Sequence, residues 1–170
     1  MKDVARYMQV HLAGAAAGID LFGLSGRRIL DEKISAEVLR IREELVDERQ
    51  RLVRMVNEFG ASDPVLLNLA TRLGAQLVRL GPAGNWRRRT PLTDLVVLET
   101  MRDAVAGKIA GWQALLTVVD EHPPLDREEL EWLLAQGEAQ HDTLTRAHRE
   151  ISARVLAATE AAREARPAAH

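Results

Sequence analysis

Glu138 and His141 stand three residues apart in a segment with helical periodicity, so their side chains share one helix face. A carboxylate and an imidazole at this spacing can ligate a metal ion, or they can join a buried network of ion pairs and hydrogen bonds. Other polar residues also fall at or beside core positions of predicted helices. They are His11 (or its neighbour Leu12), Asp20, Glu48, Glu99, Arg102, Lys108 and His148. Because burying a polar group costs free energy unless it finds a partner, these positions are the candidate functional residues.

The rise of an α-helix, about 1.5 Å per residue, predicts which of these side chains lie at the same depth. Residues at similar depth on neighbouring helices are expected to pair. The expected pairs are Glu48 with His141, Glu99 with His148, Asp20 or Glu44 with Arg102, and Lys108 with Glu138. We therefore interpret the inward-facing polar residues first as buried ion pairs and hydrogen-bonded histidines.

Four apolar stripes with spacings of three and four residues predict the helices that carry these residues. They span about residues 4–22, 35–59, 91–120 and 126–156. Ser35 is the expected N-cap of the second helix, with a hydrophobic staple between Ile34 and Leu39. Thr90, followed by proline, is the expected N-cap of the third. Asp126 and Glu129 resemble a capping box at the start of the fourth.

The long connection between the second and third helices contains one more helical pattern, over about residues 64–80. Short, long and short connections in sequence predict an antiparallel four-helix bundle, all-α, with a crossover between two hairpins. We expect one domain over residues 1–156 and a fraying, alanine-rich and charged tail over 157–170. Gly14 and Gly18, four apart in the first helix, predict a close interhelical contact.

The order of connections and the Glu138-Ala-Gln-His141 step resemble the ferritin-like superfamily. That resemblance implies iron or manganese as a cofactor, held by carboxylates of two helices and Glu-x-x-His of the other two. The residues that it implies as metal ligands are Asp20, Glu44, Glu48, Glu99, Glu138 and His141. The sequence departs from the family pattern at Glu44-Leu-Val-Asp47, where the family has histidine at the last position.

Composition excludes several other classes of function. The chain of 170 residues has no cysteine, so it has no disulfide, thiolate metal site or thiol nucleophile. A formal net charge of -2 and 4% aromatic residues argue against nucleic-acid binding. No run of about 20 apolar residues predicts a membrane span, and the mixed-charge N-terminus does not resemble a signal peptide, so we expect a soluble, cytoplasmic protein.

No complete catalytic motif accompanies the helical pattern, which favours a non-enzymatic role through an unknown protein partner or homo-oligomerisation. The alternative is a carboxylate-bridged metal protein with oxidoreductase or metal-storage activity. The basic loop Trp86-Arg-Arg-Arg89 is expected to be solvated, with Trp86 either covering the bundle end or anchoring a partner.

Overall fold

The computed structural model describes residues 2–60 and 90–164, with side chains described to residue 157. These ranges contain four α-helices, a short 3-10 helix and no strand. They are α1 (Lys2–Gly26), α2 (Glu32–Glu58), α4 (Pro91–Leu116), η1 (Val119–Glu121) and α5 (Arg127–Glu164). The all-α prediction is confirmed. The predicted helix over residues 64–80 and the Trp86–Arg89 loop lie outside the described residues.

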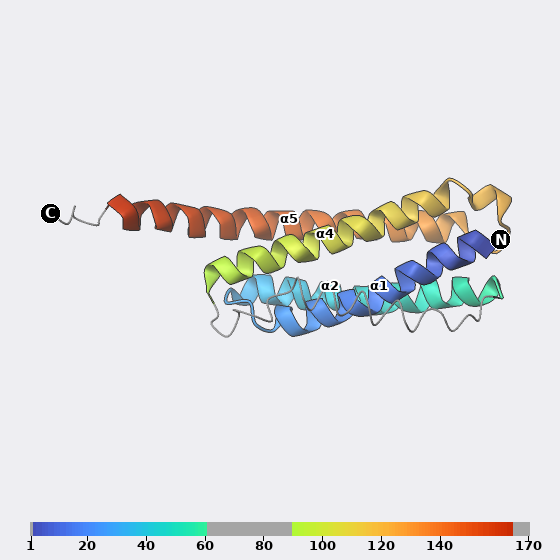
Figure 1. Cartoon of the computed structure of the whole chain (residues 1–170), viewed down its shortest axis with the longest axis horizontal. Helices are drawn as coiled ribbons and strands as arrows, with labels where there is room; N and C mark the ends of the chain where they lie inside the picture. Colours follow the sequence, from blue (N-terminus) through green and yellow to red (C-terminus); the bar gives the residue numbers. More distant parts are fainter. Residues whose placement is uncertain (1, 61–89, 165–170) are drawn as a thin grey trace.

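The helices pack side by side along one long axis (Figure 1). Helix α1 packs against α2, α4 packs against α5, and further contacts join α1 to α4 and α2 to α5. The start of α1 lies at the same end as the start of α5, while α2 and α4 advance in the same direction. Helix α5 projects beyond the other three and continues to Glu164, past the predicted end at residue 156.

Two apolar clusters form the core. One, near the turn between α1 and α2, contains Phe22, Ile41 and Leu98 among its buried members. The other, towards the opposite end, contains Met8, Leu52 and Trp112. Since Leu52 follows Ile41 on α2 and Trp112 follows Leu98 on α4, the residues midway between them occupy a layer that separates the clusters.

The start of α2 differs from the prediction. Its N-cap is Asp31, whose Oδ1 accepts hydrogen bonds of 3.1 Å from the backbone N–H groups of Lys33 and Ile34. Ser35 lies inside the helix, and its hydroxyl donates to the Gly26 carbonyl oxygen at 2.9 Å. The predicted Ser35 cap and its staple were therefore wrong, because a carboxylate earlier in the chain already caps the first turn.

The other helix starts follow the sequence more closely. Thr90 caps α4 by accepting a 3.2 Å hydrogen bond from the Thr93 N–H, with proline in the first turn. Asp126 accepts a 3.2 Å hydrogen bond from the Glu129 N–H. Gly60, just after α2, has a φ of 65°, a conformation that glycine adopts without strain. At its other end α4 stops at Leu116, earlier than predicted.

The described residues form no close contact at Gly14 or Gly18, where the sequence predicted one. A Cβ added at either position meets no described atom within 4 Å. The close approaches lie elsewhere: a Cβ at Gly26 would stand 2.8 Å from Val38 Cγ1, and one at Gly111 would stand 2.7 Å from His11 Cε1. Helix α1 therefore approaches its neighbours closely at those two levels and leaves space around Gly14.

Candidate functional site

Gln140 of α5 lies at the centre of the layer between the two apolar clusters. Only 2% of the residue is exposed. Its amide nitrogen donates hydrogen bonds to Glu44 Oε2 at 2.9 Å and to Glu48 Oε1 at 2.8 Å. Its oxygen accepts a 2.5 Å hydrogen bond from Lys108 Nζ. One amide side chain thus links two carboxylates of α2 to an ammonium group of α4.

Lys108 and Glu48 form the ion pair of this layer. Nζ of Lys108 lies 2.5 Å from Glu48 Oε2, and the two side chains are 16% and 3% exposed. Burial raises the pKa of Glu48, while the positive charge of Lys108 opposes that rise. Burial likewise lowers the pKa of Lys108 against the opposing effect of Glu48. For both groups desolvation is the largest effect, so the charged forms are held at a cost.

Gly137, one turn before Gln140, leaves room for the lysine side chain. A Cβ at Gly137 would stand 3.4 Å from Lys108 Cε and 3.1 Å from Ile109 Cγ1. The gap in the apolar stripe of α5 at this position is therefore where the stem of Lys108 crosses to α2.

One of the predicted pairs is confirmed and the others are not. His148 Nε2 lies 3.0 Å from Glu99 Oε1, as the depth estimate predicted. Glu48, in contrast, bonds to Lys108 and Gln140 rather than to His141. A residue on a helix is rotated by about 100° from its neighbour. This rotation buries Gln140 and leaves His141 partly exposed.

The remaining predicted pairs were wrong for the same reason. Glu138 is exposed and Lys108 turns to Glu48 instead. Glu44 accepts from Gln140 and pairs with Arg40 on its own helix, and Asp20 is exposed. Within the described residues no ion pair joins Arg102 to either acid.

The six candidate metal ligands are not brought together. Glu44 and Glu48 meet at Gln140, whereas Asp20, Glu99 and Glu138 are exposed. In the described part of the chain no group of three or more His, Asp or Glu side chains is arranged to hold a metal ion. Lys108 binds the buried carboxylate that a cation would need. Iron or manganese binding stays a prediction, without support from the geometry.

A cavity of about 400 Å³ adjoins this layer between α1, α2 and α4. Glu48 and Lys108 line it at one level, and most of the remaining wall is apolar. Small residues contribute to the space: Gly14 and Ala15 of α1 and Ala104 and Gly107 of α4 line it. An apolar cavity of this size with a few polar groups has the usual form of a small-molecule site.

Two side chains that line the cavity carry a buried hydrogen-bond donor without a partner among the described residues. Trp112 is 4% exposed, and no described group accepts from its indole N–H. Nε of Arg49 is buried and likewise has no described acceptor. Both side chains line the cavity, together with His11, whose pKa is lowered by burial. Unsatisfied buried donors are rare, and each one costs free energy as long as no acceptor reaches it.

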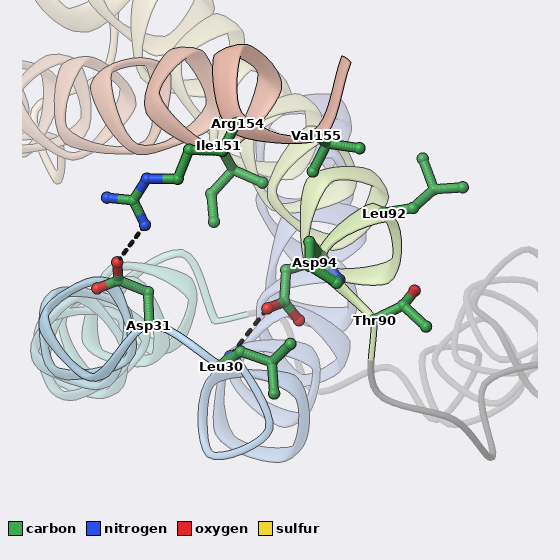
Figure 2. Close-up of a pocket in the computed structure, with 9 residues that line it drawn as sticks. Leu30, Asp31, Thr90, Leu92, Asp94, Ile151, Arg154 and Val155 are labelled. Carbon is green, nitrogen blue, oxygen red and sulfur yellow. Dashed lines mark hydrogen bonds and ion pairs between the residues drawn. The ribbon is translucent and has the colours of Figure 1, made fainter. Parts of the chain in front are cut away.

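A second pocket, of about 530 Å³, lies at the end of the bundle where α2 and α4 begin (Figure 2). Asp94 is 4% exposed, and its carboxylate accepts a 2.8 Å hydrogen bond from the Leu30 N–H. Arg154 of α5 reaches Asp31 at 2.8 Å. Because these polar groups are already paired, the pocket presents mainly the apolar side chains of Leu30, Leu92 and Val155.

Comparison with known protein families, with curated proteins and with solved structures gives no match to this chain. No described helix is both long enough and apolar enough to cross a membrane.

The sequence analysis missed Gln140, Arg49 and Trp112 as site residues. Gln140 follows the buried Leu133 by seven residues and precedes the buried Leu144 by four, so its spacing places it on the core face. That signal was present in the sequence. The unpaired donors of Arg49 and Trp112 were not visible, since partners become known only when the helices are assembled.

Proposed function

We propose that this chain is a non-enzymatic helical bundle that binds a small apolar molecule in the cavity between α1, α2 and α4. The observation that carries the proposal is the cavity itself, about 400 Å³ in volume and largely apolar, with the side chains of Arg49 and Trp112 in its wall. Action through a protein partner or self-association, expected from the sequence, is a separate prediction that sedimentation analysis tests.

The proposal includes an antiparallel bundle with ferritin-like topology. Support comes from the short connections between α1 and α2 and between α4 and α5, each joining helices in close contact. Adjacent helices joined by short connections are antiparallel in such bundles. The topology supplies a frame for the site but carries no activity by itself.

The test is calorimetric titration of the protein with 1-decanol, a neutral and mostly apolar probe. We expect binding to the wild type and loss of binding in Gly14→Leu, because Gly14 lines the cavity and the added side chain has room to enter it. Gly18→Leu is the matched control: it lies one turn away on α1, has equal space around it and does not line the cavity.

Helical content measured by circular dichroism establishes that each variant is folded. Binding that is equal in the wild type and Gly14→Leu, or no binding to the folded wild type, contradicts the proposed function.

A further inference from the structure

The polar groups in the wall of the cavity differ in whether they are already paired. Both oxygens of Glu48 are occupied, one by Lys108 and one by Gln140. The charge of Lys108 is matched by the same carboxylate. Arg49 belongs to none of the ion pairs among the described residues. The unmatched charge in the wall is therefore positive.

Arg49 and Trp112 lie close together along the bundle axis. The contact between Lys108 and Glu48 places these residues of α4 and α2 at one level, and both helices advance in the same direction (Figure 1). Arg49 follows Glu48 directly and Trp112 follows Lys108 by one turn. At about 1.5 Å per residue, the Cα atoms of Arg49 and Trp112 are separated by about 4–5 Å along the axis. Both residues line the same cavity.

We propose that the polar end of the ligand is a carboxylate, bound by the Arg49 guanidinium. This inference rests on the proposed function and names its ligand class: an apolar monocarboxylate with its chain along the apolar wall. A guanidinium and a carboxylate match in charge and geometry. The Arg49 guanidinium, which takes part in no ion pair among the described residues, would gain a counter-charge in a largely apolar wall.

The test compares three probes with the same ten-carbon chain: decanoate, 1-decanol and decylammonium, titrated calorimetrically at pH 7.5 below their micelle-forming concentrations. We expect decanoate to bind roughly 10- to 100-fold more tightly than 1-decanol, the range for a hydrogen bond to a charged group. Decylammonium should bind most weakly, since its charge would face Arg49.

Variants locate the effect. Arg49→Met should remove the preference for decanoate, so that decanoate and 1-decanol bind the variant with similar affinity. Arg54→Met is the matched control for charge: Arg54 is 57% exposed on the same helix and lies outside the cavity wall. It should leave all three affinities as in the wild type.

The outcomes separate the two proposals. If 1-decanol binds as tightly as decanoate while Gly14→Leu blocks both, the carboxylate inference is overturned and the proposed function stands. An equal loss of decanoate affinity in Arg49→Met and Arg54→Met also overturns it, since the effect is then one of net charge. If none of the three probes binds the folded protein, both proposals fail.

Discussion

The ammonium group of Lys108 lies 2.5 Å from the Glu48 carboxylate, in a layer that separates two apolar clusters of the core. The pair is completed by Gln140, which bonds to both members. Such a pair can be nearly neutral for stability when intact, because Coulomb attraction offsets desolvation, yet costly when one member is removed. This asymmetry gives the first two predictions.

Replacing Lys108 alone should destabilise the fold strongly. Lys108→Met leaves the buried Glu48 carboxylate without its counter-charge, and we expect a loss of about 3–5 kcal/mol in the free energy of unfolding. The triple variant Glu48→Leu, Lys108→Met, Gln140→Leu removes the whole network. Its free energy of unfolding should exceed that of Lys108→Met by about 3 kcal/mol. Urea denaturation measures both. A triple variant less stable than Lys108→Met would show that the network is itself strongly stabilising.

Glu48 should give stability a distinctive dependence on pH. Its pKa is raised from 4.5 by burial, so the folded state holds the proton more tightly than the unfolded state. The contribution of Glu48 is then fully present below pH 4.5 and is lost as the pH rises through its folded pKa. The measured quantity is the free energy of unfolding of the wild type minus that of Glu48→Gln. We expect this difference to fall as the pH rises through this window.

The subtraction cancels the other carboxyl groups, apart from Glu44, whose charge also raises the Glu48 pKa. A difference that rises with pH through the same window would contradict the assignment of burial as the dominant cause.

The contribution of Asp31 to stability should depend on pH in the opposite direction. Its pKa is lowered, first by the hydrogen bond from Arg154 and then by the backbone N–H of Ile34. Its contribution is present above the unfolded pKa of 3.8 and is lost as the pH falls through the lower folded value. Asp31→Asn keeps an N-cap but loses the ion pair, whereas Asp31→Ala loses both, with a further cost of about 1 kcal/mol.

Thermal denaturation at pH 6 and at pH 2.5 compares these Asp31 variants. The wild type should exceed Asp31→Asn in stability at pH 6, and the gap should be smaller at pH 2.5. A gap of equal size at both values would assign the effect to something other than the charge of Asp31.

Two glycines of α4 should respond in opposite directions to alanine. A Cβ at Gly111 would stand 2.7 Å from the His11 ring, so Gly111→Ala should destabilise the protein by about 1–3 kcal/mol through overpacking. Gly107 has no described atom within 4 Å of an added Cβ. There the higher helix propensity of alanine should stabilise the protein by up to about 1 kcal/mol. Chemical denaturation of both variants checks the contrast; destabilisation of equal size in each would mean that helix propensity and local space do not govern these sites.

Local sequence patterns determined much of this fold. Apolar residues three and four apart predict the helices, and Thr90 and Asp126 mark two of their starts, because periodicity and capping depend on neighbouring residues alone. The same patterns identified Glu48 and Lys108 as inward-facing polar residues, and depth alone predicted the contact between Glu99 and His148.

The tertiary structure decided which buried groups meet. The depth of a residue along a helix does not fix its rotation about the helix axis. The sequence therefore predicted His141 as the partner of Glu48, where Gln140 faces the core instead. It also predicted Glu138 as the partner of Lys108, which binds Glu48. The sequence also predicted a close contact at Gly14, where the structure has a cavity. Space and unpaired donors between helices arise only when three helices pack together, and the cavity with Arg49 and Trp112 is a property of that packing.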